Sequence, residues 1–528
     1  MAKIVFKTTP VDAESPTEPH KTMSMIVGKD LPCSSGSSTA DEDLMGSADA
    51  LLCPLLEKFE ETPLLADQKP KRRRRTGDVI TPTRAIITLS KGMFNAGVFS
   101  LPYAWKLGGL WLSLVVQFVI SGLNWYGNHI LVRCAQKVST EHDRTHLDYG
   151  HFTKKVFDQC GIPWLQRRSK RLMYVVNVSI MFYQLGICSV AILFICKNVQ
   201  SFVLQWMDVD VNVILIATGA LFIVLLTNMY TELRVISVFA VLSACFFLAG
   251  ATAILIYCWT KPNQWASLNA VGEPLNIVMF VGMVMYAYEG QTMVLPIENK
   301  LEYPADFLDN CGVLPTTMVL TTVLMTAMGF FGYTAFGDVI ASTITLNLPL
   351  SPFFMIVILC LAMQSLLGHS ISMYVVFDMF YNGYRRKVNA RFPWTTGHPK
   401  LVDAAFRSFW VFTTYLMAIA IPKLEILIPL VGVTAGTLCA MIYPPLLETI
   451  LEWSSWRARL TAAQFWRKIF FNVAFMTLGV VGLCAGLYAN VVAIYAAFAS
   501  GDAYSTYNDA TAKAAQEAIA AKERIAVV

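Results

Sequence analysis

Two charged side chains lie inside long apolar stretches of this sequence, where a charge could do chemistry. Glu289 is near the middle of residues 274–296, and Lys91 is within residues 84–105. A charge at the centre of a membrane-spanning helix costs roughly 2.5–3.5 kcal/mol on insertion scales, so a functional role is the default hypothesis. Three roles of Glu289 stay open: pairing with an ammonium or basic side chain of a substrate, carrying a proton, or acting as a structural partner of Lys91 or of a backbone group.

The same two stretches share a kind of interruption. The first reads SKGMFNAGVFSLP from Ser90 to Pro102, and the second reads YAYEGQTMVLP from Tyr286 to Pro296. Glycine weakens a helix, whereas proline removes a backbone donor and crowds the preceding turn. Each stretch is therefore predicted to form two half-helices around a short unwound segment, with helix-breaking residues Gly97, Pro102, Gly290 and Pro296.

The elements that must position these residues are apolar helices. The chain of 528 residues is 55% hydrophobic and 15% charged, and residues 1–84 hold 25 of its 77 charged residues. A soluble domain has roughly 25% charged residues, so an ordinary soluble enzyme is excluded and an all-α integral membrane protein is predicted. Stretches of membrane-spanning length occur at 84–105, 110–136, 172–196, 212–227, 235–258, 274–296, 313–336, 353–379, 408–421, 426–446 and 469–497.

Basic residues indicate the orientation of these eleven predicted helices. With a cytoplasmic N-terminus, the inside loops hold 20 Lys and Arg residues and the outside connections hold only Lys106, Lys197, Lys261 and Lys423. Positive residues favour the cytoplasmic side, which leaves the C-terminus extracytoplasmic. The predicted domains are a disordered tail (1–83), a membrane domain (84–497) and a short extracytoplasmic tail (498–528). Within the membrane domain, repeat one covers about 84–258, repeat two about 274–446, and an extra helix 469–497.

Interrupted helices at matching positions of two halves are the best sequence indication of a transporter's binding site. The ends of half-helices favour a carboxylate on one side and a cation on the other, as an amino acid requires. His369 fits either helix packing or proton relay, and Tyr183-Gln184 fits either a cavity wall or contacts between helices.

Other kinds of chemistry have no support in the sequence. There is no Walker A loop, G-x-S-x-G or H-E-x-x-H motif, so neither ATP-driven transport nor catalysis is indicated. His142, His146 and His151 read as parts of a solvated loop, and we expect no metal or cofactor. The net charge of +5 is too small to favour nucleic acid as a partner.

Four motifs follow one another along the chain: Lys91-Gly92 through Gly97 to Leu101-Pro102, Leu131-Val132-Arg133-Cys134-Ala135, Leu147-Asp148-Tyr149-Gly150, and Tyr286-Ala287-Tyr288-Glu289-Gly290 running to Leu295-Pro296-Ile297-Glu298-Asn299-Lys300. In this order they resemble the amino acid/auxin permease family, and within it the proton-coupled amino acid transporter group. The match is best over the first six predicted helices. One departure concerns the proton: Thr88 stands where proton-coupled members tend to carry a His, so Glu289 and His369 become the coupling candidates.

The resemblance implies a leucine-transporter-like fold with a five-plus-five inverted repeat and one extra helix. It also implies secondary transport of amino acids, cationic or small neutral, often coupled to protons. Carried over to this chain, the substrate-binding residues are Asn95, Ala96, Gly97, Val98, Tyr286, Glu289 and Gly290. The alternatives are an amino acid sensor that signals through the N-terminal tail and a non-coupled facilitator. A plasma membrane location is expected, with an endosomal or lysosome-like membrane as the alternative, and no oligomeric state is indicated.

Overall fold

The protein is helical throughout the part of the chain that its computed structural model describes, which is residues 79–141, 147–207, 209, 211–230, 233–349 and 351–499. An isolated parallel bridge between Ile80 and Leu301 is the one extended pairing among these residues. Three predictions fall wholly or largely outside the described part: the tail up to residue 78, His142 and His146 of the solvated loop, and the C-terminal tail from residue 500.

The helices follow one another with short connections. The first half of the chain contains α2 (Pro82–Met93), η1 (Ala96–Ser100), α3 (Leu101–Gly108), α4 (Leu110–Glu141), α5 (Tyr149–Gln159), α6 (Pro163–Gln166), α7 (Ser169–Met207), α8 (Val213–Asn228) and α9 (Leu233–Thr260). The second half contains α10 (Pro274–Ala287), α11 (Gln291–Glu298), η2 (Pro304–Phe307), α12 (Val313–Phe336), η3 (Gly337–Val339), η4 (Ile344–Asn347), α13 (Pro352–Arg391), η5 (Pro393–Gly397), α14 (Pro399–Ala420), α15 (Leu424–Val431), the π-helical turns η6 (Gly432–Gly436) and η7 (Leu438–Ile442), α16 (Tyr443–Arg459) and α17 (Ala462–Ala499).

Eight helical stretches of the described chain are long and apolar enough to cross a membrane. They are Leu110–Thr140, Ser169–Leu204, Val238–Thr260, Pro274–Glu298, Val313–Val339, Pro352–Arg391, Leu424–Arg459 and Ala462–Ala499. The other three predicted stretches are the interrupted one at 84–105, the 16-residue α8, and 408–421, which coincides with the second half of α14 and its C-cap Ile421. About eight candidate spans thus make up an all-helical multi-pass fold, and the count of eleven stays a prediction.

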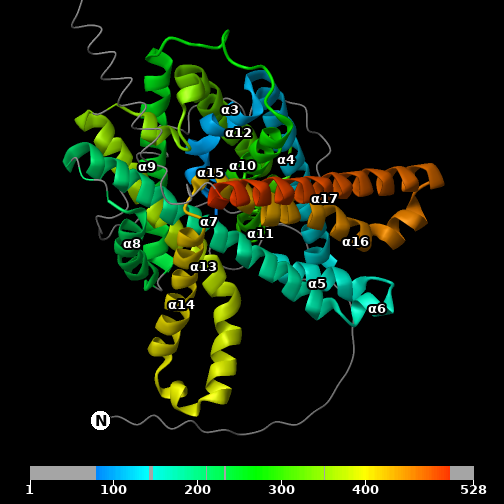
Figure 1. Ribbon diagram of the computed structural model, residues 1–528. Helices are drawn as coiled ribbons and strands as arrows, with labels where there is room; N and C mark the ends of the chain where they lie inside the picture. The colour runs from blue at the N-terminus through cyan, green and yellow to red at the C-terminus, as the bar shows by residue number, and fades with distance from the viewer. Residues whose placement is uncertain are drawn as a thin grey trace, which may run out of the picture. The chain divides into compact units, whose positions relative to one another are not determined.

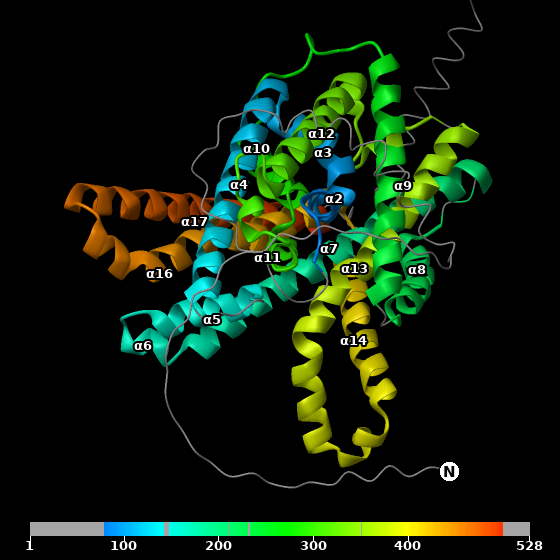
Figure 2. The ribbon, with the colours of Figure 1, turned by 180° about the vertical axis from the view of Figure 1, so that it is seen from behind.

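Several helices are longer than their apolar stretches. α13 has 40 residues, where the sequence predicted a helix over 353–379. At 1.5 Å per residue it is about 60 Å long, twice the roughly 30 Å of a bilayer core. The C-terminal part of α13 and the N-terminal part of α14 lie side by side and extend away from the other helices in both views (Figures 1 and 2). Hydropathy could not predict the polar ends of these helices, because it detects only their apolar part.

Both interrupted helices are present, and their halves pack crosswise. α2 and α3 are separated by Phe94, Asn95 and η1, and α10 and α11 are separated by residues 288–290. α2 packs against α11, and α3 packs against α10. The four half-helices lie together in both views (Figures 1 and 2). The two breaks are therefore neighbours in space, although about 190 residues separate Asn95 from Tyr286.

Long helices surround this pair. α7 packs along α13, and α13 packs along α9, while α14 contacts α7 and α8. The π-helical turn η6 packs directly against α10. If Gly432 of η6 had a Cβ atom, that atom would lie 2.1 Å from the carbonyl oxygen of Gly282 in α10. Small residues at such crossings let helix backbones touch. Contact between the backbones of α10 and η6, and not only between their side chains, therefore fixes the position of α10.

Candidate functional site

The break in the first interrupted helix is closed by its own asparagine. Asn95 precedes η1, and its Oδ1 accepts a hydrogen bond from the backbone N–H of Gly97 at 2.8 Å. Asparagine is a preferred residue at helix starts because its side chain satisfies a free backbone donor. Pro102 follows as the second residue of α3, where a missing N–H costs nothing. The local sequence thus ends one helix and starts the next.

The break in the second interrupted helix is held by a neighbouring helix. Gln291, the first residue of α11, accepts from the N–H of Gly290 at 3.3 Å and donates to the carbonyl oxygen of Tyr288 at 3.4 Å. Its Nε2 also donates to Oδ1 of Asn124 on α4 at 2.7 Å. Pro296 lies inside α11, two residues before its end, and not at the break itself.

A close contact joins the two breaks. A Cβ on Gly97 would lie 2.4 Å from Cδ1 of the Tyr286 ring, so no larger residue fits without movement of the ring. Nδ2 of Asn95 also donates to the carbonyl oxygen of Tyr286 at 3.4 Å. Gly97 and Tyr286 are thus in mutual contact, as the predicted site requires.

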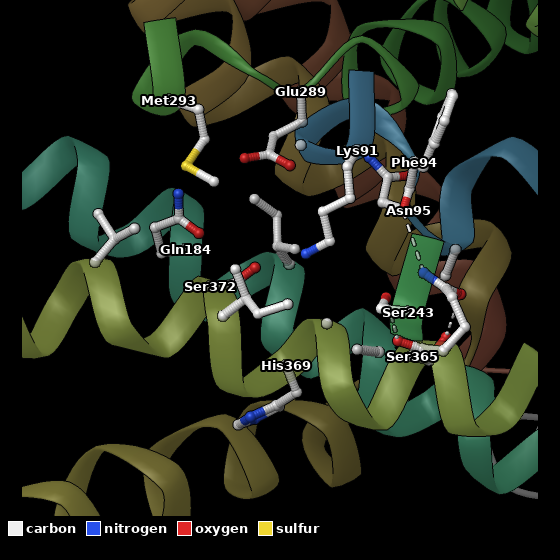
Figure 3. A pocket seen from close by; sticks show the side chains of 18 of the residues that line it. Lys91, Phe94, Asn95, Gln184, Ser243, Glu289, Met293, Ser365, His369 and Ser372 are labelled. Atoms are coloured by element: carbon white, nitrogen blue, oxygen red, sulfur yellow. Dashed lines mark hydrogen bonds between the residues drawn. The ribbon is translucent and has the colours of Figure 1, made fainter. Parts of the chain in front are cut away.

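A buried cavity lies beside the breaks, with a volume of about 50 Å³. It is bounded by the first break, α7, α9, α13 and the end of α10. Glu289, which is only 5% exposed, and Lys91 both point into this space (Figure 3). Within the described residues, no ion pair of 4 Å or less joins their charged groups. One anionic and one cationic group therefore face the same cavity.

Polar groups of α7 and α11 lie next to Glu289. Gln184 and Thr292 lie near its carboxyl group, and Gln184 Nε2 donates to Thr292 Oγ1 at 2.8 Å. The Oε1 of Gln184 is buried without a partner in the described structure. This amide side chain therefore offers an acceptor beside the Glu289 carboxyl group. The sequence left two roles open for Gln184, a cavity wall or a contact between helices. The structure shows both, because Gln184 lines the cavity and its hydrogen bond to Thr292 joins α7 to α11.

His369 reaches the cavity wall from α13, but its ring is occupied elsewhere. Asn228 on α8 lies 3.1 Å from its Nδ1, and Thr414 on α14 lies 3.2 Å from its Nε2. The ring points away from Glu289 and Lys91 (Figure 3). An amide donor on Nδ1 favours the tautomer with the proton on Nε2, which fits the hydroxyl oxygen of Thr414. These contacts suit helix packing better than proton relay.

The predicted substrate-binding residues divide into two groups. Asn95, Ala96, Tyr286 and Glu289 line the cavity, whereas Gly97, Val98 and Gly290 pack around it without forming its wall. The structure thus brings most of the predicted residues together at one place.

One polar face of α13 also lines the cavity and was not predicted from the sequence. Gln364 donates to the carbonyl oxygen of Phe94 at 3.1 Å, and Ser365 and Ser372 line the cavity with it. Together with His369 these residues follow helical spacing, at relative positions 0, 1, 5 and 8, along an apolar helix. That polar stripe is a signal that a helical-wheel reading of residues 353–379 could have found.

An all-helical multi-pass protein with a polar cavity where two interrupted helices meet belongs, as a class, with membrane transport proteins. The sequence profile described as "Transmembrane amino acid transporter protein" matches residues 78–491. This chain therefore belongs to the transmembrane amino acid transporter family. It is an integral membrane transporter of amino acids and not an enzyme, and the resemblance noted in the sequence is confirmed.

Two curated relatives agree with this assignment. "Probable amino acid transporter skat-1" of Caenorhabditis elegans is 57% identical over 431 residues, which cover 81% of this chain and 93% of the relative. "Proton-coupled amino acid transporter-like protein pathetic" of Drosophila melanogaster is 22% identical over 383 residues, which cover 71% of this chain and 78% of the relative.

Proposed function

We propose that this protein is an amino acid:proton symporter that works by alternating access and uses Glu289 as its proton-carrying group. The observation that carries the proposal is the position of Glu289 in the second break, buried in the cavity with no ion-pair partner within 4 Å in the described structure. A buried carboxyl group takes up a proton more readily than one in water, because desolvation disfavours its anion. The name of the distant Drosophila relative also includes proton coupling.

His369 is the weaker candidate for the proton. Both of its ring nitrogens have partners, and its ring points away from the cavity (Figure 3). A group that carries a proton must exchange partners during each cycle, and two fixed contacts oppose that exchange. We therefore assign the proton to Glu289 and a packing role to His369.

The charges of the cavity favour a zwitterionic substrate with a neutral side chain. Glu289 and the Oε1 of Gln184 would accept from the α-ammonium group, and Lys91 would attract the α-carboxylate. A substrate with a basic side chain would bring a second cation to a cavity that already holds Lys91. The volume of about 50 Å³ also favours a small substrate, since one water molecule needs roughly 10–15 Å³ in this measure.

The finer architecture belongs to the same proposal. Eleven membrane-spanning helices would form two inverted repeats, 84–258 and 274–446, with 469–497 added, and the N-terminus would be cytoplasmic. The crosswise packing of α2 with α11 and of α3 with α10 supports this arrangement, because an inverted repeat relates the two interrupted helices in that way. The half-helices around the breaks would move against α7, α9 and α13. The plasma membrane is the proposed location.

Uptake of labelled amino acids by a transport-deficient cell tests the proposal. Glycine or alanine uptake should be several-fold faster at an external pH of about 5.5 than at about 7.5, because the lower external pH drives protons inward and favours the protonated form of a buried carboxyl group. A protonophore that collapses the gradient should remove the difference, and arginine should be a poor substrate. Equal uptake at both pH values would point to a facilitator, and fast arginine uptake would contradict the assigned substrate class.

Deletion of residues 1–70 separates transport from sensing. Proton-dependent uptake should survive the deletion, because every cavity residue lies after residue 90. Loss of uptake in a truncated protein that still reaches the membrane would mean that the tail is part of the transport cycle.

A further inference from the structure

A second, larger pocket lies away from the transport cavity, among α3, α10, α15 and α17. Its volume is about 440 Å³. Most of the lining is apolar, with four alanines of α17 forming one wall: Ala489, Ala493, Ala496 and Ala497. α17 is the least buried of the candidate spans, at 22%, so the helix that forms this wall has most of its surface on the outside of the bundle. In a membrane protein that surface meets lipid.

Lys423, Glu425 and Tyr103 make up one polar end of this pocket, and Asn276 of α10 is a further polar residue of its lining. Lys423 immediately precedes α15, and Glu425 lies in its first turn. Tyr103 of α3 completes this end, and its hydroxyl group lies within electrostatic range of the Glu425 carboxylate. Lys423 lies in the three-residue connection between α14 and α15, which is where a chain turns at a membrane surface.

The charged groups at this end have no partner in the part of the chain that the structure describes. Neither Lys423 nor Glu425 forms an ion pair within 4 Å or a side-chain hydrogen bond, and the hydroxyl group of Tyr103 has no hydrogen bond either. Opposite charges two residues apart, next to an apolar wall, are complementary to an amphipathic molecule with a zwitterionic head.

We propose that this pocket binds a zwitterionic aminophospholipid of the phosphatidylethanolamine type. Lys423 and the hydroxyl of Tyr103 would donate to the phosphate, and Glu425 would accept from the primary ammonium group. Charge-assisted hydrogen bonds of this kind are stronger than neutral ones. The acyl chains would lie along the alanine wall of α17. Glu425 repels the head of an anionic lipid, and a choline head has no N–H to donate to the carboxylate.

Such a lipid would contact moving parts of the transporter. The pocket includes Tyr103 and Leu107 of α3 together with Leu275 and Met279 of α10. These two helices are the paired halves on one side of the breaks. A lipid wedged between them and α17 would change how easily the halves separate, so transport should depend on the lipid head group.

Lipid retention and uptake together test this site. The full-length protein is purified in mild detergent, and bound phospholipid is identified by native mass spectrometry after addition of phosphatidylethanolamine or phosphatidylcholine. Wild type should retain phosphatidylethanolamine several-fold better, and E425Q should lose that preference. D338N is the matched control, because Asp338 is an exposed carboxylate outside the pocket lining. Retention does not require transport, so this result is independent of the proposed symport.

The same variants are then compared in vesicles of phosphatidylethanolamine with phosphatidylglycerol and of phosphatidylcholine with phosphatidylglycerol. Uptake by wild type and D338N should be faster with phosphatidylethanolamine, and E425Q should respond equally to both. A493L, which fills the apolar wall, should reduce retention of either lipid. Equal retention by wild type and E425Q, or displacement of the lipid by a free amino acid, would overturn the proposal.

Discussion

The two breaks at the centre of this transporter look alike in sequence but are built differently. In the first, Asn95 closes the gap with its own side chain by accepting from Gly97. In the second, the gap depends on Asn124 of α4, which holds Gln291 at the start of α11. The first break thus supplies fixed backbone geometry, whereas the second carries the carboxyl group of Glu289 and is tied to a separate helix. We infer that the first break sets the shape of the site. The second break carries the titratable group, so its geometry depends on the charge of Glu289.

The largest expected effect comes from the charge in the second break. E289Q keeps the shape of the side chain but removes its proton exchange, so proton-driven accumulation of alanine should fall by more than about tenfold, the equivalent of ~1.4 kcal/mol. Uptake into cells under an inward proton gradient measures this effect, with the amount of protein in the membrane as control. Accumulation close to that of wild type would remove Glu289 from the mechanism.

The glycines of the two breaks should differ in their tolerance of a methyl group. G97A places Cβ 2.4 Å from the Tyr286 ring, which is itself buried, so uptake should fall nearly as far as in E289Q. G290A is the matched variant. Its Cβ meets only the flexible side chain of Met93, at 2.9 Å, and its φ of 178° is open to any residue. If G290A were as damaging as G97A, the proposed difference between the breaks would be wrong.

An intermediate effect is expected where α4 holds the second break. N124L removes the partner of Gln291 and leaves a buried amide with one bond fewer, a loss of about 1–3 kcal/mol for an unsatisfied group. Uptake should fall several-fold with a changed KM, because the start of α11 would be less well positioned. T140A, near the C-terminal end of α4, where the hydroxyl bonds only within its own helix, serves as control. An unchanged KM in N124L would argue against a positioning role.

The smallest expected effect concerns the bridge that links the chain before α2 to the segment after α11. The N–H of Ile80 donates to the carbonyl oxygen of Lys300 at 2.9 Å. I80P removes this donor, whereas I80V keeps it. Loss of one exposed backbone bond costs about 0.5–1.5 kcal/mol, so I80P should change the uptake rate by a few-fold and I80V should not. Equal rates in the two variants would show that the bridge does not limit the cycle.

Sequence alone predicted the breaks, the family and a minority of the cavity residues, namely Asn95, Ala96, Tyr286, Glu289 and His369. Hydrophobic stretches and the paired Gly and Pro residues carried that information, because both act over short distances along the chain. The long-range contacts that position the site could not be predicted from the sequence. The contact between Gln291 and Asn124 joins residues 167 positions apart, and that between Gln364 and Phe94 joins residues 270 apart. The sequence placed Lys91 inside the first interrupted helix, but only the packing of α7 and α13 shows that it faces the cavity.

Proton movement in vesicles tests the central claim most directly. Purified protein is reconstituted with a pH-sensitive dye inside, and alanine is added outside without a pH gradient. Wild type should acidify the lumen as alanine enters, while E289Q should exchange labelled for unlabelled alanine without acidification. Acidification by E289Q, or its absence in wild type during alanine uptake, would contradict the assignment of the coupled proton to Glu289.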